Sequence, residues 1–158
     1  MDINKIKKYY KEGSKYVNIA SYINGATTSA LIAYSFIKGT GININKLSKQ
    51  QEIYTTHFTP VIEEIIKMKA KKDGKLWQMI FVQNVTEMAY YIGKGIFTKY
   101  SMLHVIKCRS YTAIMHVITG ILHTAHMGPI AIIVHHLWNK KTYNEEAIDR
   151  LVGYNKEK

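Results

Sequence analysis

The stretch Pro60-Val-Ile-Glu-Glu-Ile-Ile-Lys67 places two adjacent glutamates inside an apolar run. Adjacent carboxylates repel each other, and burial of an unpaired charge costs several kcal/mol or shifts its pKa. Because proline suits the first turn of a helix, we expect a helix that begins near Pro60. It carries Glu63 and Glu64 either at a solvated edge or in a functional site. Taken alone, the edge is the favoured interpretation, since Lys67 pairs with either glutamate at helical spacing.

Four apolar segments organise the chain, and they cover residues 17–37, 53–68, 76–97 and 111–139. A single helix over the last segment would be about 43 Å long, more than a bilayer core requires. Gly128-Pro129 within it predicts a kink or a re-entrant turn. The expected fold is therefore all-α, a polytopic membrane bundle of about four core helices. One membrane-embedded domain covers residues 1–158, with cytoplasmic basic tails at 1–15 and 140–158.

Basic residues outnumber acidic ones by 22 to 11, which gives a net charge of +11. Such an excess favours a nucleic acid or an anionic membrane surface as partner. The lysines lie between the apolar segments and not among aromatics on one face, so we expect membrane lipid and no nucleic acid. Odd-numbered connections hold fifteen basic residues and even-numbered ones seven. This asymmetry predicts an integral membrane protein with cytoplasmic termini, in the plasma membrane of a prokaryote.

Small residues recur at every fourth position of the first segment, namely Ser21, Gly25, Ser29 and Ala33. That spacing predicts a smooth helix face along which another helix approaches closely in lipid. The mean hydropathy of −0.15 favours the alternative, a soluble helical domain with a crowded helix contact.

The third segment contains an ionisable residue, Glu87, in apolar company. A carboxylate inside a membrane segment is a functional candidate. The alternative is a hydrogen bond to a tyrosine, or a salt bridge that fixes the packing of the helices.

The fourth segment holds five of the seven histidines: His116, His123, His126, His135 and His136. His116 and His123 lie seven residues apart on one helix face, and His135 and Asn139 share a face four residues apart. For His123, His126 and His136 we favour a structural role, with hydrogen bonds to backbone carbonyls.

Four short motifs in this chain resemble those of the PrsW-type intramembrane proteases. Residues 60–67 resemble the first, Glu-Glu-x-x-Lys after a proline, and Glu87 with Tyr91 resembles the second. His116-Val-Ile-Thr-Gly120 resembles the third, and His135-His-Leu-Trp-Asn139 matches the fourth, His-x-x-x-Asn. The motifs occur in the family's order and span about half the chain. The family is related to the CAAX-processing and bacteriocin-processing (CPBP or Abi) membrane proteases.

The resemblance implies an intramembrane endopeptidase that cleaves a transmembrane protein or peptide with an activated water. Peptide hydrolysis needs that water, a group that stabilises the oxyanion and a proton donor for the leaving amine. The implied catalytic residues are Glu63, Glu64, Glu87, His116, His135 and Asn139, with Lys67 balancing the carboxylates. Glu63 or Glu64 would hold the water with His116 or His135 as partner. His135 and Asn139 would direct donors at the oxyanion, and Glu87 would orient a histidine.

The resemblance leaves two features of the site open. Two glutamates and two histidines would make an adequate zinc set, but the family pattern does not decide whether a metal is needed. His116 joins the site only if the chain turns back at Gly128-Pro129, because the third and fourth motifs lie nineteen residues apart. At position 83 the family usually has phenylalanine, whereas this chain has Gln83.

Three other classes of protein fit the same sequence. A non-catalytic membrane scaffold or immunity-type protein would use this fold to bind a partner. A membrane cytochrome would use histidines on facing helices as haem ligands. A soluble, basic helical module is the third.

Overall fold

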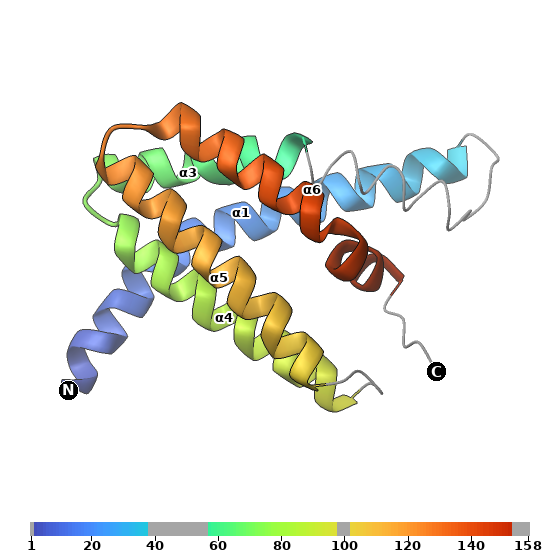
Figure 1. The fold of residues 1–158 in the computed structure, drawn as a ribbon, viewed down its shortest axis with the longest axis horizontal. Helices are drawn as coiled ribbons and strands as arrows, with labels where there is room; N and C mark the ends of the chain where they lie inside the picture. The colour runs from blue at the N-terminus through green and yellow to red at the C-terminus, as the bar shows by residue number, and fades with distance from the viewer. Residues whose placement is uncertain (1, 38–56, 98–101, 153–158) are drawn as a thin grey trace.

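The computed structural model describes residues 2–37, 57–97 and 102–152, and these are helical apart from short turns (Figure 1). The helices are α1 (Ile3–Ile37), α3 (Thr59–Lys72), α4 (Leu76–Phe97), α5 (Met102–Thr124) and α6 (Gly128–Val152). The expectation of an all-α fold is confirmed. Within the described ranges, no helix combines the length and the apolar character that a membrane crossing requires.

Helix α3 lies at the centre of the arrangement and packs against α1, α4, α5 and α6. Helices α4 and α5 run side by side, and α6 returns from the end of α5 to lie along α3 (Figure 1). Side chains that α3 points inward therefore meet α4, α5 and α6 together.

The turn between α3 and α4 follows from its sequence, Asp73-Gly74. Gly74 has a positive φ of 69°, a conformation that glycine adopts without strain. Its N–H donates to the carbonyl of Lys71 at 2.9 Å, and the N–H of Lys75 donates to that of Ala70 at 2.7 Å. These bonds satisfy carbonyls that the end of α3 would otherwise leave unpaired.

The turn between α5 and α6 confirms the predicted reversal at Gly128-Pro129. The N–H of Met127 donates to the carbonyl of Leu122 at 2.8 Å, and His126 adopts a positive φ of 60°. The predicted fourth segment is therefore two helices and not one kinked span. Its first helix also begins earlier than expected, at Met102 and not near residue 111.

The remaining boundaries agree with the sequence to different degrees. Helix α4 has the limits predicted for the third segment, 76–97. Helix α1 begins at Ile3, so most of the expected tail 1–15 is helical, and α6 likewise continues past residue 140. Helix α3 covers the end of the second segment, whereas residues 53–56 and the loop before them lie outside the described residues.

The predicted contact along the small-residue face of α1 is wrong within this chain. All four of its residues are exposed, and a Cβ added at Gly25 would meet no atom within 4 Å. Helix α1 instead packs tightly against α4 at Gly13, where a Cβ would overlap the backbone carbonyl of Gln78. The periodicity was correct for a helix, but the close packing at Gly13 occurs about three turns nearer the N-terminus than Gly25.

Polar and apolar side chains are distributed in an unusual way. A small apolar core is formed by Tyr16, Ala20, Ile66, Ala70 and Met79. Charged and polar side chains are buried beside it, among them three histidines, two glutamates and a lysine. Many large apolar side chains on α4, α5 and α6 are exposed instead. Burial of this many ionisable groups would destabilise the fold unless they pair with one another.

Candidate active site

Glu64 lies at the centre of a buried polar cluster. Its side chain has no exposed surface, although it is charged, because it points inward from the central helix α3. Its Oε2 is 2.9 Å from Nζ of Lys67 and 2.8 Å from Nδ1 of His135 on α6. Its Oε1 is 3.0 Å from Nε2 of His123 on α5. One carboxylate therefore joins three helices.

These contacts set the ionisation of Glu64. Burial raises the pKa of the carboxyl, but the Lys67 ammonium and the hydrogen bonds from His123 and His135 outweigh it. The pKa of Glu64 is consequently held well below its usual range. Because an ionised carboxylate only accepts hydrogen bonds, His123 donates through Nε2–H and His135 through Nδ1–H.

Lys67 is the counter-ion of the cluster and is also fully buried. Its Nζ contacts Glu64, Nδ1 of His116 at 2.9 Å and the hydroxyl of Thr119 at 3.0 Å. An ammonium has three donors and no acceptor, so these three contacts use its full capacity. Nδ1 of His116 accepts from Lys67, which leaves the proton of a neutral His116 ring on Nε2.

Glu63 occupies a less enclosed position than Glu64, with a side chain 9% exposed against 0%. Its Oε2 accepts a hydrogen bond from Nε2 of Gln83 at 3.2 Å and lies 3.7 Å from Nε2 of His135. The carboxylate requires the N–H end of the Gln83 amide, so Oε1 of Gln83 points away, where it is buried with no hydrogen-bond partner among the described residues. The His135 ring thus lies between two carboxylates.

Glu87 lies at the edge of the cluster. Its Oε2 forms an ion pair with Nη1 of Arg109 at 3.0 Å, and Arg109 stacks over the ring of Tyr91 with its Cζ 4.3 Å from the centroid. Nε2 of His116 is 3.8 Å from the same carboxylate, too far for a hydrogen bond. The salt bridge between α4 and α5 matches the structural alternative considered for Glu87.

The structure thus brings Glu63, Glu64, Lys67, His116 and His135 together. The α5–α6 turn places the rings of His116 and His135 edge to face, with centroids 5.7 Å apart. The condition set for including His116 is therefore met. Asn139 lies one turn beyond His135 on α6 and is half-buried, and the hydrogen bonds described above do not include it.

Two members of the cluster were not assigned to it from the sequence. The structural role favoured for His123, a bond to a backbone carbonyl, is wrong, because its ring bonds the Glu64 carboxylate. Its seven-residue spacing from His116, which places both rings on one helix face, was the available signal. Gln83 was noted only as a departure from the family pattern.

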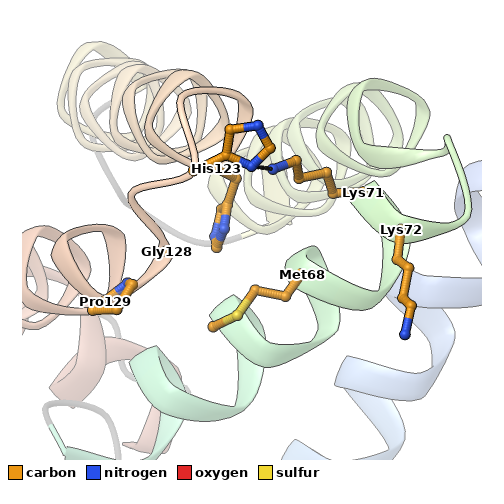
Figure 2. Close-up of a pocket in the computed structure, with 7 residues that line it drawn as sticks. Met68, Lys71, Lys72, His123, Gly128 and Pro129 are labelled. Carbon is orange, nitrogen blue, oxygen red and sulfur yellow. Dashed lines mark hydrogen bonds between the residues drawn. The ribbon is translucent and has the colours of Figure 1, made fainter.

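A pocket of about 410 Å³ adjoins the cluster at the α5–α6 turn. Its lining consists of Met68, Lys71, Lys72, His123, His126, Gly128 and Pro129. Figure 2 shows Lys71 reaching from α3 to the turn, where its Nζ is 2.9 Å from Nδ1 of His126. His123 connects this pocket with Glu64.

Zinc was considered for the cluster from its residue types. In the part of the chain that the structure describes, no three histidine, cysteine or acidic side chains have an arrangement that would hold a metal ion. The Lys67 ammonium, 2.9 Å from Glu64, supplies the positive charge beside that carboxylate. The residues as arranged therefore do not fit a zinc site centred on Glu64.

The chain matches no protein-family model, no curated protein and no solved structure. The resemblance to the PrsW-type proteases therefore remains one of short motifs in the family's order.

Proposed function

We propose that the chain is a PrsW-like endopeptidase in which Glu63 and His135 activate a water molecule and Glu64 orients His135. The observation that carries the proposal is the placement of the His135 ring between two carboxylates. Glu64 lies 2.8 Å from Nδ1 and Glu63 lies 3.7 Å from Nε2. One carboxylate can orient the histidine ring while the other, with the ring, holds a water molecule for attack.

The orientation of His135 follows from the contact at Nδ1. Because Nδ1–H donates to Glu64, Nε2 of the neutral ring presents a lone pair toward Glu63. A separation of 3.7 Å between two acceptors is one that a single bridging water spans, with one O–H donated to each. Orientation of a catalytic imidazole by a buried carboxylate is the arrangement that serine hydrolases use.

The chemistry would proceed by general base catalysis. The water oxygen attacks the peptide carbonyl while Nε2 of His135 takes its proton, and Glu63 holds the second O–H. The C–N bond then breaks as His135 returns the proton to the leaving amine. Nε2–H of His116, on the ring that packs against His135, would serve as the donor for the oxyanion. Gln83 keeps Glu63 in place.

The outer surface supports a membrane setting for this reaction. Exposed large apolar side chains recur at helical spacing on α4 (Trp77, Phe81, Val85), α5 (Ile114, Ile118, Ile121) and α6 (Ile130, Ile133, Leu137). Soluble monomers rarely expose so much apolar surface, and here Glu63, Glu64 and Lys67 are buried inside the bundle. We therefore place these faces against lipid, as a membrane-embedded bundle with cytoplasmic termini. The substrate class is a transmembrane protein or peptide.

The test is hydrolysis by the full-length chain, reconstituted in liposomes with a mixture of membrane-derived peptides in H2¹⁸O. Mass spectrometry should find new carboxyl termini that carry one oxygen-18 atom. Glu63→Gln should abolish their formation and preserve helicity, because the new amide oxygen can still accept the hydrogen bond from Gln83 and Glu63 has no charged partner closer than 3.7 Å. Glu12→Gln makes the same chemical change in α1, away from the cluster, and should retain activity.

Two outcomes would contradict the proposal. Undiminished cleavage by Glu63→Gln would remove Glu63 from the mechanism. Absence of labelled products from the wild-type chain would favour the non-catalytic membrane scaffold.

A further inference from the structure

Charge balance among the lysines of α3 and the following turn singles out the pocket at the α5–α6 turn. The five are Lys67, Lys69, Lys71, Lys72 and Lys75. Three contact carboxylates: Lys67 contacts Glu64, Lys69 contacts Asp73 at 3.2 Å, and Lys75 contacts Glu12 at 3.0 Å. Neither Lys71 nor Lys72 has a carboxylate partner among the described residues, and these two line the pocket. The unbalanced charge that reaches the α5–α6 turn is that of the Lys71 ammonium, through its contact with His126.

The pocket also contains a buried polar side chain. The His123 ring is 1% exposed and lines the pocket while its Nε2 bonds Glu64. Its Nδ1 faces Gly128, since a Cβ added at Gly128 would lie 3.5 Å from that nitrogen and 3.3 Å from Sδ of Met68. A side chain at position 128 would therefore enter the space between His123 and Met68. Figure 2 shows this opening, with Lys71 reaching toward the turn and Lys72 extending away from it.

The contact between Lys71 and His126 shows a lysine ammonium in the pocket that no anionic side chain of the described residues contacts. An ammonium that bonds a neutral imidazole nitrogen keeps its full charge, because no anion neutralises it. His126 holds this contact at a positive φ of 60°, a backbone conformation that a residue with a side chain adopts at a cost. Anions bind such clusters through charge-assisted hydrogen bonds, which are about twice as strong as neutral ones.

We propose that this pocket binds a phosphate group, with Lys71 as the charged donor, His126 as a neutral neighbour of its ammonium and His123 at the inner wall of the pocket. A tetrahedral phosphate offers oxygens in several directions, which suits donors from α3 and from the turn, whereas a carboxylate offers two in one plane. Nε2–H of His123 is committed to Glu64, so Nδ1 of the neutral ring accepts the O–H of a singly protonated phosphate. The volume of about 410 Å³ accommodates a phosphate with part of the molecule that carries it.

This site is distinct from the position assigned to the attacking water, and its existence does not depend on peptide hydrolysis. The phosphate comes either from a phospholipid headgroup or from a soluble phosphate or phosphate ester. His123 is shared with the Glu64 cluster, so occupation of the pocket orders a ring that contacts the proposed active site.

Binding of inorganic phosphate to the full-length protein in detergent, at constant ionic strength, tests the proposal. Histidine ring resonances in NMR spectra should shift for His123 and His126 and give the affinity. The double variant Lys71→Gln/Lys72→Gln should weaken binding by about tenfold or more, the loss expected for one charge-assisted hydrogen bond. The control Lys7→Gln/Lys8→Gln removes the same charge from exposed positions of α1 and should change the affinity less than about twofold.

Equal phosphate affinity in both double variants would overturn the proposal. Acetate that competes as strongly as phosphate would overturn the assignment to phosphate. Vesicles of phosphatidic acid and of phosphatidylcholine separate the two sources. If the pocket variant alone loses binding to phosphatidic acid vesicles, the source is a lipid headgroup. If vesicle binding is equal but inorganic phosphate is lost, the source is soluble.

Discussion

Glu64→Gln should destabilise the fold strongly, and loss of Lys67 should relieve part of that cost. Both side chains are fully buried and lie 2.9 Å apart. A variant that removes one partner leaves the other charge buried and unpaired, which costs about 3–5 kcal/mol. Domains of this kind have total stabilities of about 5–15 kcal/mol, so Glu64→Gln should lose a large share.

The double variant Glu64→Gln/Lys67→Met removes both charges at once. We expect it to be more stable than the sum of the two single losses predicts, with a coupling energy of about 2–3 kcal/mol. The assay is denaturant unfolding of the full chain in detergent, followed by circular dichroism of the helices. Lys69→Met is the control, and its unfolding free energy should change little because its ion pair is solvent-exposed. Single-variant costs that add within about 0.5 kcal/mol would refute the buried ion pair.

Two further predictions concern α1 and its contacts. The phenol of Tyr16 donates to the Asp73 carboxylate at 2.7 Å, which with burial raises the pKa of Tyr16 to about 12. The stability that this contact contributes should be present below the ordinary pKa of tyrosine and lost as the pH rises through about 12. In Asp73→Asn, the absorbance titration of Tyr16 should return toward the usual tyrosine range. Gly13→Ala should destabilise α1 by about 1–3 kcal/mol, because its Cβ would overlap the Gln78 carbonyl. Gly25→Ala has open space and should instead stabilise the helix by about 0.5–1 kcal/mol; equal thermal shifts for both variants would contradict the α1–α4 packing.

The sequence predicted those parts of the structure that depend on local patterns. The limits of α4 follow from an apolar run that begins after Gly74 and needs no information from other helices. The reversal at Gly128-Pro129 follows from segment length and from the two residues that most often interrupt a helix. The meeting of Glu64 with His135 was expected from the resemblance to the PrsW-type proteases, and the cost of burying ionisable groups separately gives it a physical reason.

The parts that could not be predicted depend on which face of a helix is turned inward. His123 has the same local surroundings as a histidine bonded to a carbonyl, and only the position of α3 shows that its partner is Glu64. The distinct roles of Glu63 and Glu64 likewise depend on the rotation of α3. The small-residue face around Gly25 does not pack within the described part of this chain, and spacing alone does not show where the neighbouring helix lies.

The Glu64–Lys67 pair also bears on the order in which the helices come together. Both charges belong to one turn of α3, so Lys67 can pair with Glu64 within this helix before any other helix packs against it. Arg109 differs, because its partner Glu87 belongs to another helix. Burial of the Arg109 side chain therefore leaves an unpaired charge unless α5 packs against α4. The Glu64–Lys67 pair can therefore form before α3 packs against other helices, whereas the Glu87–Arg109 pair forms only when α4 and α5 come together.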